Sequence, residues 1–350
     1  MSTRQTYKGI LSILVMLTIA ICNVSSDIWN SIKISDPSWD LYGTITVITQ
    51  WGLPLLISLI GMIYLDRDIY YSTSMVYKKL LPQATIACSF WWIISALIQL
   101  KTNHSNEMDF DTFLECMGKV LYEPFNIFLL QLFVIMFAFY PLLTRIVSNN
   151  KLLFYALITS FVICMFFPAI EQIPYIRYIN LFTNQINWNF FTSYGFYLLF
   201  GIWVMRTNFD WHHRIVVYCS GVLSSVAMIT LTKIISASLL DIDSRYVNIS
   251  SPFVVFQALA VMVLLKQIIS TNFKTPILKI VTNELTYNIY GYIVMFVIIN
   301  NIISYYISSG IAFLLPLCSC IATNIVCAFL RRLPIVSFLF CEFKIRGDRI

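Results

Sequence analysis

The sequence predicts an all-α polytopic membrane protein with about ten transmembrane helices and both termini in the cytoplasm. The first observation is composition: of 350 residues, 59% are hydrophobic and 11% are charged, and the mean hydropathy is +0.77. A soluble domain carries about 25% charged residues, so this chain has too few to cover a soluble surface. The second is that the charges form short clusters between apolar runs of roughly the 20 residues that span a bilayer. A soluble enzyme, a disordered chain and a coiled coil are therefore excluded.

Ten apolar segments have this length or nearly have it. The first and sixth are shorter than a full span, so their helices can extend into the flanking residues. No repeat or linker interrupts them, so residues 1–350 are predicted to form a single membrane-embedded domain. Arg4 and Lys8 precede the first segment as in a signal sequence, but no small-residue cleavage site follows, which favours an uncleaved first span. The segments are Gly9–Val24, Leu41–Leu65, Leu81–Leu100, Pro124–Leu143, Leu152–Ile170, Phe190–Met205, Ile215–Leu240, Pro252–Ile269, Ile289–Tyr306 and Ile311–Leu330.

The distribution of charge orients these segments. With a cytoplasmic N-terminus and alternating spans, 17 Lys and Arg residues fall inside and 5 fall outside, while 11 acidic residues fall outside and 6 inside. Cytoplasmic loops of membrane proteins carry an excess of Lys and Arg. The net charge of +6 is therefore explained by topology, and no nucleic-acid partner is expected.

Sequence patterns for metal and cofactor sites are weak. Most of the nine Cys lie in predicted spans, and Cys318, Cys320 and Cys327 have no neighbouring His or carboxylate, so packing is favoured over a metal site. The acidic loop 101–123 lacks the glycine turn of a calcium loop and is predicted to be solvated. The phosphate-loop, dinucleotide, zinc-protease and serine-hydrolase signatures do not occur. We expect neither a bound metal nor a tightly bound cofactor.

Two ionisable residues near the membrane are candidates for function. Lys233 lies in the outer part of the seventh segment, where it either extends to the outer headgroups or faces an internal cavity. Glu123 precedes Pro124 at the start of the fourth segment. An acid before a first-turn proline is ordinary helix-start chemistry, and a general base is the alternative.

Five short motifs occur in an order that resembles one known family. They are Trp51-Gly52-Leu53-Pro54-Leu55 through Gly61, Tyr77-Lys78-Lys79-Leu80-Leu81-Pro82, Phe128 to Pro141-Leu142-Leu143, Tyr197-Leu198-Leu199-Phe200-Gly201 and Tyr287-Asn288-Ile289-Tyr290. Together with the predicted topology they resemble the ten-span integral-membrane acyltransferases (acyltransferase family 3), which O-acylate surface polysaccharides and lipids. The resemblance covers nearly the whole chain by pattern more than by identity.

The resemblance implies a catalytic Arg and His in the first span, and this sequence departs from both. Ser12 stands at the Arg position and Asn23 at the His position, and Ile293 replaces a His that usually follows the ninth-span motif. An asparagine amide hydrogen-bonds a hydroxyl but does not take its proton as an imidazole does. The expected catalytic set is therefore Asn23 and Ser12, with Glu123 as the alternative acid or base.

The resemblance also implies substrates and a location. An acyl-CoA, most simply acetyl-CoA, is the expected donor, and a cell-surface polysaccharide or lipid-linked glycan is the expected acceptor. Arg67, Lys78 and Lys79 form a basic cluster where CoA phosphates would bind, although positive-inside topology accounts for the same charges. The expected location is a bacterial cytoplasmic (inner) membrane, with lipids as partners. Two alternatives remain: an inactive relative that serves polysaccharide export or assembly, and a secondary transporter, for which no paired broken segments are found.

Overall fold

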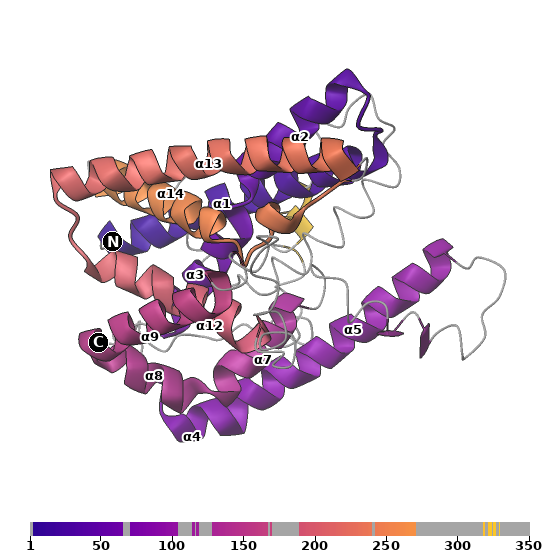
Figure 1. Cartoon of the computed structure of the whole chain (residues 1–350). Helices are drawn as coiled ribbons and strands as arrows, with labels where there is room; N and C mark the ends of the chain where they lie inside the picture. Colours follow the sequence, from indigo (N-terminus) through magenta and orange to yellow (C-terminus); the bar gives the residue numbers. More distant parts are fainter. Residues whose placement is uncertain are drawn as a thin grey trace. The chain divides into compact units, whose positions relative to one another are not determined.

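The computed structural model describes residues 3–65, 71–103, 128–166, 189–239 and 242–270, together with a few isolated residues. Within these ranges every regular element is a helix, so the predicted all-α class is confirmed there (Figure 1). The chain divides into two compact units. Unit 1 contains residues 1–68 and 145–283, and unit 2 contains residues 69–144 and 284–350. Each unit is described by itself.

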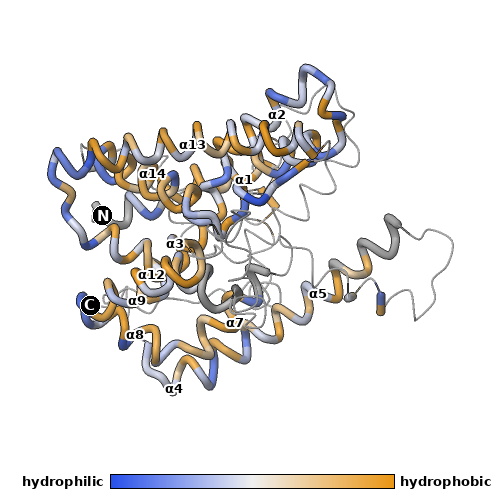
Figure 2. The backbone as a smooth tube through the Cα atoms, viewed as in Figure 1, coloured by the Kyte–Doolittle hydropathy of each residue, from blue (hydrophilic) through white to orange (hydrophobic). Residues whose placement is uncertain are grey.

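Several helices are long and apolar enough to cross a membrane, which identifies an integral membrane protein. Four such spans occur among the described residues, or five if a bent helix pair at 131–148 counts as one span. Hydrophobic residues dominate the middles of these helices, and hydrophilic residues gather mostly in the connections (Figure 2). The ninth predicted segment and most of the tenth lie outside the described residues. The four spans are Ile10–Ser31, Pro37–Tyr64, Trp211–Leu239 and Arg245–Ile268.

Unit 1 is built around a helix that is buried on nearly all sides. This central helix, α3, is apolar around its whole circumference, and all its residues except Leu53 are buried. Such a helix belongs in a core, and α3 contacts α1, α12 and α14. The helices of unit 1 are α1 (Thr3–Ser31), α2 (Pro37–Thr49), α3 (Gly52–Tyr64), α9 (Asn150–Phe161) with a π-helical turn η2 (Val162–Phe166), α12 (Asn189–Arg206), α13 (Trp211–Leu239), the short η4 (Arg245–Val247) and α14 (Pro252–Ser270).

Helix α13 lies along α14 and turns its other side outward (Figure 1). Its buried residues recur every three or four positions and are mostly small: Gly221, Ser224, Met228, Thr232 and Ser236. Small residues let two membrane helices approach closely. Large apolar side chains such as Val216, Leu223 and Ile234 are about two-thirds exposed. In a membrane protein this exposed apolar face suits contact with lipid.

An ion pair and a hydrogen bond stabilise the connection between α13 and α14. The Asp243 carboxylate forms an ion pair with Arg245, and the backbone N–H of Asp243 donates to Ser236 Oγ at 3.0 Å. The hydrogen bond from the Arg245 side chain lowers the pKa of Asp243 below its ordinary value. The stabilisation is therefore present at neutral pH and is lost as the pH falls through the lowered pKa.

We expect Asp243→Asn to lower the free energy of unfolding by about 1 kcal/mol at neutral pH, because the Arg245 side chain is half-exposed and its ion pair is screened. Thermal unfolding of both proteins across a pH series measures the difference. The difference in stability between the two proteins should shrink as the pH falls below the ordinary pKa of aspartate. A difference that stays constant down to pH 3 would show that the ion pair contributes nothing.

In the described part of unit 2, the helices are α4 (Thr73–Met75), a π-helical turn η1 (Val76–Leu80), α5 (Leu81–Asn103), α7 (Phe128–Ala138) and the start of α8 (Tyr140–Ser148). The predicted span Pro124–Leu143 is bent by 70° between the last two of these helices. Pro141 accounts for the bend, because it has no N–H to donate to the carbonyl of Phe137 and its ring crowds that carbonyl.

Candidate functional site

The residues predicted from the first span lie on one helix but far apart. Ser12 is fully buried in α1, and Asn23 is half-buried further along the same helix. Eleven residues of α-helix separate their Cα atoms by about 16 Å and return to nearly the same face. One substrate atom therefore cannot contact both side chains, and Asn23 is the more exposed of the two.

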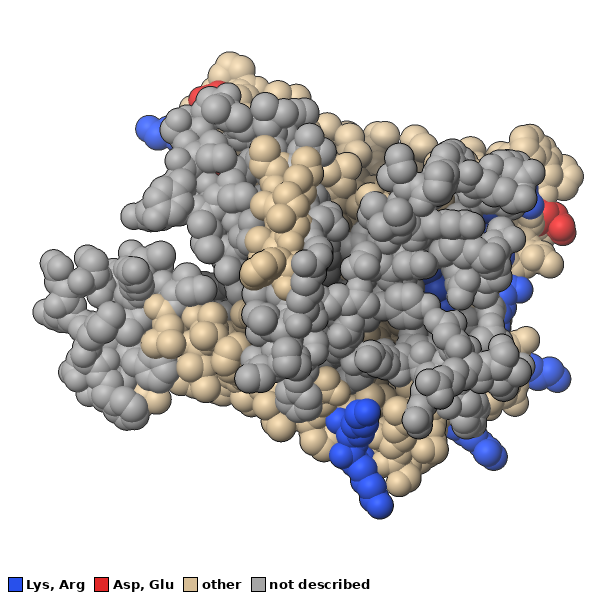
Figure 3. Space-filling view, turned by 180° about the vertical axis from the view of Figure 1, so that it is seen from behind, with Lys and Arg blue, Asp and Glu red and all other residues tan. Residues whose placement is uncertain are grey.

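The other predicted site residues lie in unit 2 or outside the described residues. Lys78 and Lys79 are exposed neighbours on η1 in unit 2. Visible basic side chains project outward from the face shown in Figure 3. Arg67 and Glu123 lie outside the described residues. The basic cluster of Arg67, Lys78 and Lys79 therefore stays a prediction.

A proline bends the second span at its middle. The segment Pro37–Tyr64 forms one span of two helices, α2 and α3, which meet at Gln50 and Trp51. Pro54 causes the interruption because it cannot donate to the carbonyl of Gln50, four residues earlier. The last turn of α2 tightens, and the N–H of Gln50 donates to the Val47 carbonyl at 3.4 Å. Backbone carbonyls are consequently left to be satisfied inside the membrane.

Gln257 on α14 supplies a further donor to carbonyls in the last turn of α2. Its Nε2 group donates to the carbonyls of Val47 at 3.1 Å and Ile48 at 3.4 Å, and also contacts Ser225 Oγ of α13 at 2.9 Å. The Gln257 side chain is 4% exposed. One buried amide therefore ties the end of α2 to both α13 and α14.

Side chains from α1 complete a polar cluster at the same level. The Cys22 thiol donates to Gln50 Oε1 at 3.3 Å, and Thr46 Oγ1 donates to Ser25 Oγ at 3.0 Å. Asn23 follows Cys22 in sequence, and among the described residues none forms a hydrogen bond with its amide. One residue of α-helix turns the half-buried Asn23 side chain about 100° around the axis from Cys22. We term Cys22, Ser25, Thr46, Gln50 and Gln257 the bend cluster, and Asn23 adjoins it on α1.

Two of the family-like motifs contact each other in unit 1. Gly61 ends the second-span motif on α3, and a Cβ there would overlap the carbonyl oxygen of Leu198 in the sixth-span motif on α12. Gly201, which ends that motif, also lies close to α3, since a Cβ there would lie 2.6 Å from the Ser58 carbonyl. The two glycines therefore set the close crossing of α3 and α12.

Two lysines at the end of unit 1 where α1 begins donate hydrogen bonds to helix carbonyls. Lys8 is 8% exposed and donates to the Met62 carbonyl of α3 at 2.7 Å. Lys266 donates to the carbonyls of Val204, Met205 and Thr207 at 2.8–3.1 Å, at the C-terminus of α12. Ammonium groups suit this position because the last carbonyls of a helix have no partner within it.

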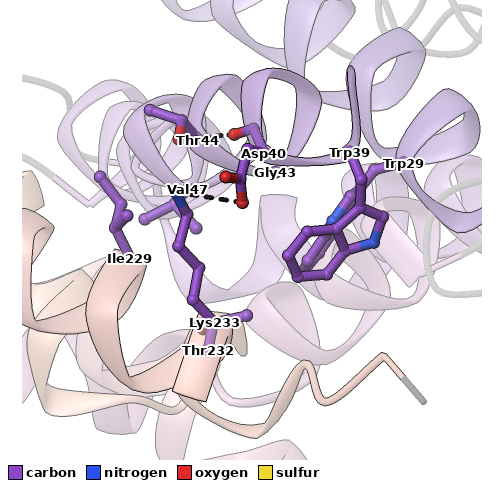
Figure 4. Close-up of a pocket in the computed structure, with 9 residues that line it drawn as sticks. All are labelled: Trp29, Trp39, Asp40, Gly43, Thr44, Val47, Ile229, Thr232 and Lys233. Atoms are coloured by element: carbon purple, nitrogen blue, oxygen red, sulfur yellow. Dashed lines mark hydrogen bonds and ion pairs between the residues drawn. The ribbon is translucent and has the colours of Figure 1, made fainter. Parts of the chain in front are cut away.

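At the opposite end, α1, α2 and α13 enclose a small pocket, and it contains Lys233 (Figure 4). Lys233 Nζ lies 3.1 Å from Asp40 Oδ1, and their side chains are 40% and 60% exposed. Lys233 therefore lines a cavity, as one of the two predicted positions requires, and its extension to the outer headgroups stays a prediction. Trp29, Trp39, Gly43, Thr44, Val47, Ile229 and Thr232 form the rest of the wall.

Sequence reasoning did not select Trp29 and Trp39 for this pocket. They flank the polar connection between α1 and α2, and their ring centroids lie 5.6 Å apart at an interplanar angle of 47°. Their position around a turn is a signal that they are close to each other. Nothing in the sequence places them beside α13.

Comparison with protein-family models, with curated proteins and with solved structures gives no match for this chain.

Proposed function

We propose that the chain is a membrane O-acyltransferase-like protein that transfers an acyl group, most simply acetyl, from acyl-CoA to a cell-surface polysaccharide or lipid-linked glycan. The proposal includes ten spans with both termini in the cytoplasm of a bacterium. The observation that carries it is the contact of the two family-like motifs through Gly61 and Gly201. Motifs separated by about 140 residues contact each other as parts of one structural unit would.

In this proposal an acceptor hydroxyl binds at Asn23, which adjoins the bend cluster on α1. The Asn23 oxygen accepts a hydrogen bond from a hydroxyl and orients it, but the amide does not remove the proton. Positioning and nearby dipoles must therefore supply the rate, since loss of a general base costs roughly 10²–10⁴-fold. The proposed enzyme is accordingly slow compared with one that has a histidine at this position.

The donor would approach from the cytoplasmic side of the second and third spans. Lys78 and Lys79 are exposed, and with Arg67 they are the groups proposed to contact the phosphates of CoA as point charges. In this proposal CoA is a substrate, and the bond that breaks is its thioester.

The second candidate is a catalytically inactive relative that assists polysaccharide export or assembly. What favours it is the chemistry of the site positions themselves, because Ser12, Asn23 and Ile293 replace ionisable groups. In the described part of the chain, the only histidines are His212 and His213 at the start of α13, at the far end of that helix from Lys233. Neither candidate assigns a role to these two residues.

Mass spectrometry of purified surface glycan tests the proposal in the organism that carries the gene. We expect acyl esters on the glycan of the wild type, their loss on deletion of the gene, and at least tenfold less acylation when Asn23→Ala replaces the wild-type copy. Ser31→Ala is the matched control on α1, because its exposed hydroxyl donates only to the Ile28 carbonyl of its own helix, eight residues beyond Asn23. Unchanged acylation in the deletion strain would refute an acyltransferase, and altered glycan export with no acyl change would favour the inactive relative.

A further inference from the structure

The pocket at the end of unit 1 has three buried polar atoms without a hydrogen-bond partner in the described structure. They are the indole nitrogens of Trp29 and Trp39 and the hydroxyl oxygen of Thr232, on side chains that are 2–4% exposed. All three residues line the same pocket. A buried indole N–H ordinarily finds a partner, and an unsatisfied group calls for an explanation such as a bound ligand.

The shape of the pocket limits what can enter. Its interior has room for about one water molecule. Gly43 helps to form it, because a Cβ there would lie 2.8 Å from Trp29 Nε1 and would displace the indole. Figure 4 shows the two indoles on one side and the Lys233 side chain on the other. A single oxygen of a larger molecule fits inside, and the rest must remain at the mouth.

The charges at the mouth select against ions. Lys233 alone would attract an anion, but Asp40 lies 3.1 Å from its ammonium group and balances the charge. A cation is disfavoured by the two indole N–H groups, which only donate. A neutral ligand oxygen that both accepts and donates hydrogen bonds suits the pocket interior. Other oxygens of the same ligand suit the exposed Asp40–Lys233 pair, because that pair offers an acceptor and a donor side by side. A sugar ring carries adjacent hydroxyls of this kind.

We propose that this pocket binds a neutral sugar, with one hydroxyl between Trp29, Trp39 and Thr232 and the ring over the Asp40–Lys233 pair. The ligand hydroxyl replaces a water and reproduces its hydrogen bonds, which is the condition for displacing ordered water without loss. This inference rests on the proposed function and adds to it the class of ligand that binds at the end of unit 1 opposite Lys8. A glycan-binding chain without transferase activity would satisfy this inference and fail the acylation test.

The test is saturation-transfer NMR on the full chain in lipid nanodiscs prepared without sugar-based detergent. The probes are the methyl glycosides of glucose, galactose, mannose and N-acetylglucosamine. We expect binding of at least one glycoside, with the dissociation constant raised about fivefold in Trp39→Phe and in Thr232→Val, as loss of one hydrogen bond near 1 kcal/mol implies. Asp40→Asn should weaken binding as well.

Matched controls separate the pocket from the rest of the surface. Thr230→Val removes an exposed hydroxyl of α13 that bonds only to its own helix, and Trp211→Phe alters an exposed indole at the other end of α13. Both should bind like the wild type. Absence of binding by every glycoside, or equal binding by Trp39→Phe, Thr232→Val and the wild type, would overturn the proposal and leave the pocket to a resident water.

Discussion

Gly61→Ala is expected to destabilise the protein more than any other single methyl addition to its described part. The new methyl group would overlap the Leu198 carbonyl oxygen, which is backbone and cannot move as the end of a side chain can. Helices α3 and α12 must then separate, and other core contacts of α3 are lost with them. We expect a loss of at least about 3 kcal/mol, in the upper range for overpacked cores. Thermal unfolding of the purified protein in nanodiscs measures it.

Two further glycines make this prediction falsifiable even if Gly61→Ala does not fold. Gly201→Ala should be destabilising but less so, since its methyl group would lie 2.6 Å from the Ser58 carbonyl. Gly195 lies on the same helix α12 with open space around it, so Gly195→Ala should leave stability unchanged or raise it by about 0.5–1 kcal/mol. Equal stability of the Gly201 and Gly195 variants would contradict the proposed crossing of α3 and α12.

Gln257→Leu is expected to have the second largest effect. Leucine fills about the same space but removes the amide that both carbonyls share, so the Ile48 carbonyl loses its side-chain donor while the Gln50 N–H still donates to the Val47 carbonyl. An unsatisfied buried polar group costs about 1–3 kcal/mol, and water is scarce in the middle of a span. We expect a loss of about 2–3 kcal/mol and faster hydrogen exchange of the amides around Gln50.

Gln267→Leu is the matched control for this substitution. Gln267 lies on the same helix and accepts a hydrogen bond from Tyr218 at 2.8 Å, but it is only part-buried near the helix end. Its loss should cost less than about 1 kcal/mol. If the two leucine variants unfold alike, Gln257 does not cap α2 and the bend must be satisfied in another way.

The spanning segments could be predicted because bilayer length and hydropathy constrain them directly. The seventh and eighth segments agree with α13 and α14 to within a few residues. The first was too short, because α1 continues to Ser31 through polar positions such as Asp27 and Asn30. These residues lie near the end of the span, where hydropathy no longer marks the helix.

Prolines in the sequence indicate where the helices bend, although the hydropathy of the segments does not. Pro54 and Pro141 lie inside apolar runs, and each removes one backbone donor four residues after the carbonyl it leaves free. The sequence indicates where a helix is interrupted. It does not indicate the size of the bend, which is 70° near Pro141, because packing against neighbouring helices decides it.

The candidate site was predicted only in part. Asn23 was chosen from the resemblance, and the structure adds hydrogen bonds that join Cys22 to Gln50 and Gln257 to the end of α2. None of these residues carries a catalytic signature. The pocket around Lys233 depends on three helices that are distant in sequence. Its partner Asp40 has no distinguishing sequence pattern, so only tertiary packing singles it out.

Acyl transfer by the purified chain in proteoliposomes tests the central proposal most directly. The donor is acetyl-CoA labelled in its acetyl group, and the acceptor is the lipid-linked glycan fraction of the source membrane. The account predicts alkali-labile label on the glycan, slow for the wild type and faster by tenfold or more for Asn23→His, since an imidazole restores a general base. Label that remains on CoA with both proteins would contradict an acyltransferase.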